Sequence, residues 1–370
     1  MFLKKLQLNQ FKNHTESRFI FNKAVNCFVG DNGSGKTNVL DAIYYLSNTK
    51  SYFNHIDNRN IKFDEEYFMI KGSFTKEENI SEIQCNFKSG ETKKVQKNNK
   101  KYTRFSEHIG QFPTIIISPT DTNLITEGSE VRRKYLDISI AQFKQTYLQS
   151  LINYNKLLKQ RNALLKQFDE KNYFDDISLE IYDEKLIKLG NTIYQEKKSF
   201  LIELTPVFNK YYLEISNSKE IVNLEYKSQL NEDTFSNLLF KSRTKDRISR
   251  STQVGIHKDD IIFTMNNHPV KTTGSQGQQK SFLIALKLAQ FEFIKKKIGF
   301  NPILLLDDIF DKLDDNRILK LISLVNKKVF GQVFITDTHK ERSEAILNKA
   351  KITFDIFNIK NGEVSDERKQ

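Results

Sequence analysis

The stretch that decides the fold is VGDNGSGKTNVLDAIYYL, residues 29–46. It starts at the end of an apolar run and contains GDNGSGKT, which matches the eight-residue phosphate-loop pattern. The apolar positions that follow recur at helical spacing, so we expect a helix from Lys36 to about Leu46. A glycine-rich loop between a strand and a helix turns backbone N–H groups toward a phosphate. The sequence therefore predicts phosphate binding near the start of the chain.

The residues of this loop have distinct expected roles in holding a nucleotide. The ammonium of Lys36 would reach the β- and γ-phosphates, and the hydroxyl of Thr37 would ligate Mg²⁺. The expected nucleotide-binding residues of the loop are Gly30, Asp31, Asn32, Gly33, Ser34, Gly35, Lys36 and Thr37. A glycine-rich turn that matches by chance is a weak alternative, because the strand and the helix that the motif requires both flank it.

Length, charge and cysteine content limit the class of protein. A chain of 370 residues exceeds the size at which one hydrophobic core stops growing, so we expect two lobes. The net charge of +12 favours a polyanionic partner such as nucleic acid, although a lysine-rich proteome gives the same excess. The two cysteines predict neither a disulfide framework nor a metal site. With no apolar run of about eighteen residues, we expect a cytoplasmic protein without a membrane partner.

The pattern of apolar residues divides the chain into three blocks. The blocks are residues 1–120, 121–250 and 251–370. The first and third read as strands and helices of one α/β lobe, whereas the middle block has a helical period. Its apolar stripe from Leu136 to Leu158 predicts one helix of about nine turns. A second helical stretch covers about 177 to 213, interrupted near Pro206, so we predict a split sheet with an inserted antiparallel helical pair.

A second part of the nucleotide site is ILLLDD, residues 303–308. Its four apolar residues predict a buried strand that brings the Asp307 carboxylate to the Mg²⁺ at the carboxyl edge of the sheet. Asp308 follows at the position from which a carboxylate orients or deprotonates the attacking water. We therefore assign catalytic roles to Lys36 and Asp308. An acidic pair also occurs as an ordinary solvated loop start, but the phosphate loop in the same chain favours the nucleotide role.

The third part is SQGQ, which opens a predicted helix. Its residues are Ser275, Gln276, Gly277 and Gln278. A helix N-terminus presents free N–H groups and a positive dipole end. The segment resembles the ABC signature motif, usually LSGGQ, which would contact in trans the nucleotide held by a second chain. An ordinary helix N-cap by Ser275 is the alternative.

Two further segments complete this pattern. DKLDD, residues 311–315, resembles the short D-loop that crosses a dimer interface. VFITDTH resembles the switch strand, with Thr336 or Asp337 where transporters often carry His. Asp307 also lies far along the chain from Lys36, further than in compact GTPases and small-molecule kinases. This spacing is the layout of ABC-type heads in SMC-like proteins.

Over nearly its whole length the sequence resembles the RecF family of bacterial DNA-repair ATPases. The motifs that carry the resemblance are LQLNQFKNH, VGDNGSGKTNVLDAIYYL, SPTDTNLITEGSEVRRKYLD, GIHKDDIIF, SQGQQKS and LLLDDIFDKLDDNR. The resemblance implies an ABC/SMC-type P-loop ATPase head that uses ATP and Mg²⁺. It implies an ATP-dependent homodimer that binds double-stranded and gapped DNA and, with RecO and RecR, helps load recombinase. It also implies that Lys12 and Asn13 lie near the adenine; Ile256 departs from the family pattern, which often has Pro there.

The residues that would contact DNA are basic clusters. They are Arg132, Arg133 and Lys134; Lys93, Lys94 and Lys97, continued by Lys100, Lys101 and Arg104; and Lys241, Arg243, Lys245, Arg247 and Arg250. Phosphate contacts require only positive charge in the right place, so each cluster is equally consistent with a solvated face.

Two other classes of protein share part of the pattern. An ABC transporter ATPase subunit has the phosphate loop and the acidic strand end, but not a helical pair of this length or the QFKNH start. A non-hydrolysing SMC-type structural clamp needs a far longer helical arm. We expect slow, DNA-stimulated ATP hydrolysis, because the side chain of Asp308 is shorter than the Glu of fast ABC ATPases.

Overall fold

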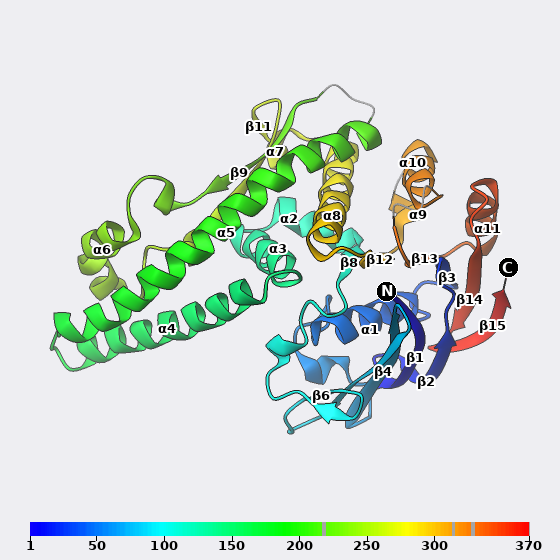
Figure 1. Cartoon of the computed structure of the whole chain (residues 1–370), viewed down its shortest axis with the longest axis horizontal. Coiled ribbons are helices and arrows are strands. Elements are labelled where there is room, and N and C mark those ends of the chain that lie inside the picture. Colours follow the sequence, from blue (N-terminus) through cyan, green and yellow to red (C-terminus); the bar gives the residue numbers. More distant parts are fainter. Residues whose placement is uncertain (217–219, 313–314, 327–329, 370) are drawn as a thin grey trace. The chain divides into compact units, whose positions relative to one another are not determined.

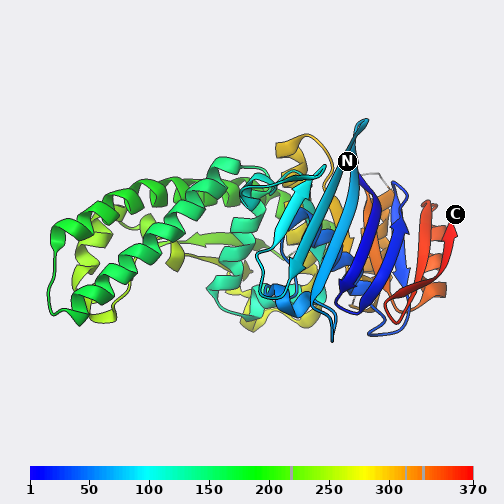
Figure 2. The same cartoon turned by 90° about the horizontal axis from the view of Figure 1, so that it is seen from below.

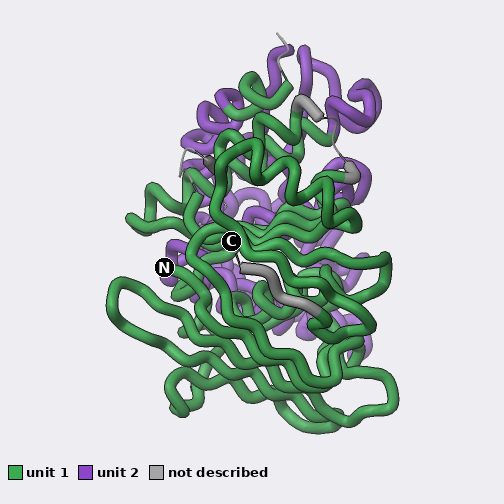
Figure 3. Tube along the Cα trace, turned by 90° about the vertical axis from the view of Figure 1, so that its right-hand side faces the viewer, with its two compact units in different colours: residues 1–121, 211–217, 280–370 green, residues 122–210, 218–279 purple. Residues whose placement is uncertain are grey.

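The structure, a computed structural model, describes residues 1–216, 220–312, 315–326 and 330–369. The chain forms two compact units (Figure 3). Unit 1 comprises residues 1–121, 211–217 and 280–370, and unit 2 comprises residues 122–210 and 218–279. Helices α5 (Asp176–Ser216) and α8 (Gln276–Ile298) each run from one unit into the other. The functional division of the chain near residues 120 and 250 stays a prediction.

Unit 1 contains a six-stranded sheet with the strand order β15-β14-β3-β13-β12-β8. Its strands are β3 (Val25–Val29), β8 (Thr114–Ile117), β12 (Ile303–Leu306), β13 (Val333–Asp337), β14 (Phe354–Lys360) and β15 (Glu363–Lys369). All pairs are parallel except β14 with β15. The sheet joins strands from both ends of the chain, which confirms the predicted split (Figure 1). Strands β3, β8, β12 and β13 are buried along their whole length, as their near-continuous apolar sequences predict.

A second sheet of unit 1 is antiparallel, with the order β2-β1-β4-β5-β6-β7. Its strands are β1 (Phe2–Phe11), β2 (His14–Ile20), β4 (Tyr67–Lys76), β5 (Asn79–Lys88), β6 (Lys94–Lys97) and β7 (Lys100–Lys101). They lie side by side in Figure 2. Alternate residues of β4 are buried, so one face of this sheet packs on the core. Leu6, Phe68 and Ile83 from this face share a hydrophobic cluster with residues of α1 (Lys36–Asn48).

Helix α1 begins at Lys36, as predicted, and is buried along most of its length. The other helices of unit 1 are the main part of α8, then α9 (Ile309–Lys312), α10 (Asp315–Asn326) and α11 (Lys340–Lys349). Phe282, Leu286 and Ala289 of α8 are fully buried, as the predicted apolar face of the signature helix requires.

Unit 2 is mainly helical but contains a small sheet. Its helices are α2 (Asn123–Thr126), α3 (Ser129–Ala141), α4 (Gln145–Glu170), the first part of α5, α6 (Phe235–Ser249) and α7 (Val270–Thr273). Helices α4 and α5 lie alongside each other as the predicted antiparallel pair (Figures 1 and 2). The sheet, with the order β11-β10-β9, consists of β9 (Val222–Lys227), β10 (Asp260–Met265) and β11 (His268–Pro269).

Two details of the predicted helical pair were wrong. The first helix is divided, because α3 ends at Ala141 and α4 begins at Gln145. The N–H groups of Phe143 and Lys144 both donate to the carbonyl of Ile140, which closes the turn between these helices. The apolar stripe continues across the turn and so conceals it. The second helix is not interrupted at Pro206, because a proline removes one backbone hydrogen bond and this long helix retains the rest.

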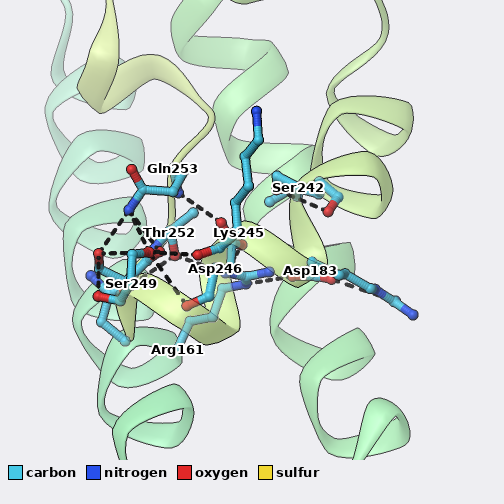
Figure 4. A network of polar contacts seen from close by, with 12 residues as sticks. Arg161, Asp183, Ser242, Lys245, Asp246, Ser249, Thr252 and Gln253 are labelled. Carbon is cyan, nitrogen blue, oxygen red and sulfur yellow. Dashed lines mark hydrogen bonds and ion pairs between the residues drawn. The ribbon is translucent and has the colours of Figure 1, made fainter.

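A buried arginine holds the helices of unit 2 together (Figure 4). The guanidinium of Arg161 on α4 donates to Asp183 of α5 at 2.6 Å and to Asp246 of α6 at 2.7 Å. It also donates to the hydroxyl of Thr252 at 2.9 Å. Arg161 is fully buried, and a buried charge is tolerated only when it is paired in this way. Within the described part of the chain, no helix is long and apolar enough to cross a membrane.

Candidate functional site

The phosphate loop has the backbone shape that its glycines predict. Gly30 has a φ of 146°, and a Cβ atom there would lie 2.2 Å from the carbonyl oxygen of Ile359. Gly35 has a φ of 116°, and its Cβ would lie 2.8 Å from the side chain of Asn13. Both positions therefore require glycine, for conformation and for close approach.

Helix α1 starts directly after this loop, and no side chain of its N-cap or first turn offsets the positive end of the helix dipole. Its N-cap, Gly35, provides no side-chain hydrogen bond, and its first turn contains no acidic residue. The first N–H groups of a helix have no partner within the helix, and the dipole adds positive potential. The loop and the helix start thus form an anion-binding arrangement.

Lys36 folds back over the loop. Its ammonium donates to the carbonyl oxygens of Gly30 at 2.7 Å and Asp31 at 2.8 Å. The residue is 5% exposed. Because an ammonium has three donors, one remains for a third acceptor at the mouth of the loop.

The carboxyl edge of the parallel sheet brings four sequence-distant oxygen groups together. Asp307, directly after β12, accepts at Oδ1 from the hydroxyl of Thr37 at 2.7 Å and from that of Thr336 at 2.9 Å. Its Oδ2 accepts from the hydroxyl of Ser118 at 3.3 Å. Burial raises the pKa of Asp307, and the neighbouring Asp308 charge raises it further, whereas the hydroxyl contacts lower it.

The residues beside Asp307 differ in where they point. Asp308 has a φ of 45°, and its backbone N–H donates to the hydroxyl of Thr336 at 2.9 Å. Asp337 turns away toward α11, where it accepts from Ser343 at 2.5 Å and pairs with Arg342. Of the two candidates for the switch position, Thr336 therefore lies beside the acidic pair.

Asn13 and Lys12 lie in different surroundings. The Asn13 amide donates to the carbonyl of Gly33 at 3.2 Å and accepts from the Asn38 side chain at 2.7 Å, so it lies against the loop. Lys12 instead pairs with the buried carboxylate of Asp41 at 2.5 Å. The placement of these two residues near adenine stays a prediction.

Contacts centred on His14 also support the phosphate loop, and the sequence did not indicate them. One ring nitrogen of His14 lies 3.1 Å from the Gly35 carbonyl, and the other lies 2.9 Å from the Ser17 hydroxyl. Ser17 donates to the carbonyl of Gly362 at 2.8 Å, and Gly362 donates to Ser34 at 2.7 Å. The turn between β14 and β15 is thereby joined to the loop. Burial lowers the pKa of His14.

The signature-like segment forms a capping box at the start of α8. The Ser275 hydroxyl accepts from the Gln278 N–H at 3.3 Å, while the Gln278 side chain accepts from the Ser275 N–H at 2.7 Å. Ser275 and Gln276 are exposed, whereas Gly277 and Gln278 are half-buried. A serine hydroxyl that accepts a bond keeps its proton for donation, so capping is compatible with a phosphate contact. DKLDD, the predicted D-loop, lies outside the residues that the structure describes in full.

Several basic residues predicted to contact DNA are engaged within the protein. Lys93 is largely buried and donates to Asp57 at 2.9 Å. Lys94 pairs with Glu91, and Lys97 donates to the side-chain oxygen of Gln111. In the third cluster Lys241, Arg243 and Arg250 pair with carboxylates. These contacts compete with a phosphate-binding role, and the DNA assignment stays a prediction.

The other basic cluster, Arg132, Arg133 and Lys134, joins two of the motifs that carry the family resemblance. Arg132 of α3 donates to both carboxylate oxygens of Asp260, at 2.7 and 3.0 Å. Arg133 donates to the backbone carbonyl of Asp259 at 2.8 Å. The part of SPTDTNLITEGSEVRRKYLD that lies in unit 2 thus pairs with GIHKDDIIF, which gives these two segments a structural role. Lys134 is exposed and pairs with Glu130.

The chain is similar to known proteins both in sequence and in structure. Residues 2–365 match the family described as RecF/RecN/SMC N terminal domain. DNA replication and repair protein RecF of Flavobacterium johnsoniae is 51% identical over 359 residues, which cover 97% of this chain and 100% of the relative. The RecF protein of Phocaeicola vulgatus is 42% identical and covers 100% of this chain and 99% of its own.

The solved structures agree with these relatives. The recombination mediator protein RecF-ATP in the RecFOR pathway has a TM-score of 0.89 and 34% identity, covering 100% of this chain and 97% of its own. The Smc head domain of Pyrococcus furiosus has a TM-score of 0.57 at 17% identity and covers 100% and 96%, which supports the fold alone. The predicted α/β head of the ABC and SMC type is confirmed. This chain belongs to the RecF family of DNA replication and repair proteins.

Proposed function

We propose that this protein is an ATP-dependent DNA-binding protein of recombinational repair, which binds ATP and Mg²⁺ in unit 1 and dimerises around the nucleotide. In this proposal double-stranded DNA stimulates slow hydrolysis, and with RecO and RecR the dimer helps load recombinase at gapped DNA. Family membership and the likeness to ATP-bound RecF support it. The observation that carries it is the 2.7 Å contact between Thr37 of the phosphate loop and Asp307 of the acidic strand end.

The residues at this contact fit a magnesium ion. A hydroxyl and a carboxylate are hard oxygen donors, which Mg²⁺ prefers as ligands. Thr37 and Asp307 would hold the ion. When bound, Mg²⁺ neutralises charge on the phosphates of the nucleotide.

The other residues of the site have roles that follow from their positions. The loop N–H groups and the ammonium of Lys36 bind the phosphates, and Asp308 orients or deprotonates the attacking water. Ser275 and the start of α8 contact the nucleotide of the partner chain, which makes each site dependent on two chains. The short side chain of Asp308 reaches the water less well than a Glu would, so turnover is slow.

Sedimentation tests the ATP-driven dimer. We expect a monomer without nucleotide and a dimer with a slowly hydrolysed ATP analogue, whereas ADP and the variant Lys36→Met leave the monomer. A monomer that persists at micromolar protein with the analogue would contradict this proposal. Phosphate release without DNA, with duplex DNA and with gapped DNA tests the stimulation.

DNA binding itself separates the proposal from the class of transporter subunits. The net charge of +12 predicts that affinity falls steeply between low and physiological salt, because bound counterions are released from DNA. Affinity that stays flat over this range, or turnover indifferent to DNA, would contradict the proposal. Co-sedimentation with RecR, with and without RecO and gapped DNA, tests the proposed partners.

A further inference from the structure

A buried ion pair anchors the signature helix inside unit 1. The ammonium of Lys287 on α8 lies 2.7 Å from Oδ1 of Asp121, and both side chains are almost fully buried. Lys287 also donates to the carbonyl of Ile116 at 3.1 Å and to the hydroxyl of Tyr52 at 3.3 Å. Three acceptors therefore surround an ammonium that has three donors. This fixes both the position and the direction of the Lys287 side chain.

The ion pair is connected to the nucleotide site through one residue. The other oxygen of Asp121, Oδ2, accepts from the backbone N–H of Ser118 at 2.8 Å. The hydroxyl of Ser118 donates to Oδ2 of Asp307 at 3.3 Å. A continuous path of polar contacts thus leads from Asp307 through Ser118 and Asp121 to Lys287. Ser118 and Asp121 both belong to the motif SPTDTNLITEGSEVRRKYLD, and the proposed chemistry does not use Asp121.

The path ends on the helix that begins with the signature-like segment. Lys287 lies eleven residues after Gln276 in the unbroken helix α8, which corresponds to about 16 Å along the helix axis. Phe282 and Leu286, on the same helix, are fully buried. Apolar packing therefore already holds α8, and a buried ion pair is seldom more stabilising than apolar residues of similar size. This argues for a role in positioning.

We propose that Lys287 and Asp121 are positioning residues that couple the hydrogen bonds of Asp307 to the signature helix of the same chain. A change in the hydrogen bonds that Asp307 accepts alters its contact with Ser118, and with it the turn that follows β8. The same turn contains Asp121, whose carboxylate pairs with Lys287. Nucleotide binding in one chain thereby prepares its own signature helix to complete the partner's site. This inference rests on the proposed ATP-driven dimer.

The variant Lys287→Met tests the coupling, because it keeps the length of the side chain and removes its charge. We expect it to bind a fluorescent ATP analogue within about twofold of the wild type, yet to need about tenfold more protein to dimerise with ATP, a factor typical of coupling between sites. Lys287→Arg, which keeps the charge, should recover most of the dimerisation. Sedimentation over a range of protein concentrations measures the shift.

A matched control is available in unit 2. Lys197 is as deeply buried and lies 3.1 Å from Asp137, but this pair belongs to unit 2, whereas the path lies in unit 1. Lys197→Met should dimerise as the wild type does. Where Lys287→Met folds poorly in thermal melting, the double variant Asp121→Asn with Lys287→Met removes both buried charges and should show the same defect in dimerisation.

A double-mutant cycle with Ser118→Ala distinguishes a connected path from separate supports. If the path acts as one unit, Ser118→Ala combined with Lys287→Met weakens dimerisation no more than the stronger single variant. The inference would be overturned if Lys287→Met dimerised as the wild type does. It would also be overturned if the double variant weakened dimerisation by the product of the two single effects. A wild-type protein that does not dimerise with ATP overturns the proposed function itself, so the two failures are distinct.

Discussion

The hydroxyl of Thr336 donates to Oδ1 of Asp307 at 2.9 Å, and through a second contact it also fixes the residue that follows. The hydroxyl oxygen of Thr336 also accepts from the backbone N–H of Asp308 at 2.9 Å. Asp308 has a φ of 45°, a conformation that non-glycine residues seldom adopt and that needs support from its surroundings. One hydroxyl thus holds both acidic residues of the proposed site.

Replacing Thr336 by Val should lower ATP turnover by about thirtyfold, because two hydrogen bonds worth roughly 1 kcal/mol each are lost where Asp308 must be positioned. The affinity for ATP should change much less, since Lys36 and the loop are untouched. Thr336→Ser, which keeps the hydroxyl, is the matched control and should retain most of the activity. Single-turnover phosphate release measures the effect; equal rates for the Val and Ser variants would contradict it.

Asp307→Asn should separate stability from function. Burial raises the pKa of Asp307, so its charge is costly in the folded protein, and an amide of the same shape avoids that cost. The nucleotide-free variant should therefore melt at or above the wild-type temperature. It should lose the stabilisation that ATP with Mg²⁺ gives the wild type. Thermal melting with and without ATP and Mg²⁺ provides both results, and an undiminished shift with ATP would count against the proposed metal site.

The parts of the site that the sequence predicted are those specified by short local patterns. The loop, α1 and the strand before Asp307 each follow from about ten consecutive residues, and the parallel sheet then brings them together. Ser118 and the contact between His14 and Gly35 were missed, because each depends on strands far apart in the sequence. A hydroxyl residue directly after an apolar strand, as Ser118 follows β8, was the available signal.

Features of the fold that local sequence patterns do not mark were also missed. The turn between α3 and α4 has no proline or glycine to mark it, and the helical period continues through it. In the small sheet, β9 and β10 pair across more than thirty residues of sequence, and only the strand pattern of β10 was recognised. Whether such segments form strands depends on their pairing partners in the folded chain, and local propensity does not determine it.

The buried Arg161 network should matter more for stability than the exposed ion pairs of unit 2. Arg161→Met leaves Asp246 buried without its cation and leaves Asp183 with only the more distant Arg243, at 3.7 Å, which should lower the free energy of unfolding by about 3–5 kcal/mol. Lys241→Met removes an exposed partner of Asp233 and should change the free energy of unfolding much less. Urea unfolding, monitored through the hydrogen exchange of residues 145–255, measures the change in the free energy of unfolding for both variants. Similar midpoints for the two variants would show that the network is energetically neutral.

His257 should make unit 2 less stable in mild acid. Burial, opposed by the hydrogen bond with the Thr252 carbonyl and assisted by the nearby cations Lys258 and Arg133, lowers the pKa of its imidazole to about 4. The unfolded chain titrates near pH 6.5, so between these values it binds more protons than the folded chain. This contribution to stability is complete above about pH 6.5 and is lost as the pH falls through 4, by about 3 kcal/mol in total.

The variant His257→Gln isolates this contribution, because it removes the titrating group while other acids and bases remain. Its free energy of unfolding should fall less steeply than that of the wild type between pH 7 and pH 5. Urea unfolding at several pH values compares the slopes. Parallel curves for the two proteins would mean that His257 does not titrate differently on unfolding.

The trans arrangement of the proposed site predicts that two inactive variants restore each other. Lys36→Met removes the charge that binds the β- and γ-phosphates, and Ser275→Arg blocks the exposed start of α8 with bulk and charge. Each homodimer then has two defective sites. In a mixed dimer one site carries both lesions, but the other combines an intact loop with an intact signature segment.

Random pairing makes about half of the dimers mixed, and each keeps one good site of two, so roughly a quarter of wild-type turnover should return if the sites act independently. Coupling between the sites lowers this fraction but leaves some recovery. The measurement is DNA-stimulated phosphate release from each variant alone and from an equimolar mixture, with sedimentation to show that ATP brings the chains together. If the chains associate and the mixture does no better than the average of its parts, Ser275 acts only as the cap of α8, through the hydrogen bonds with Gln278 that the structure contains.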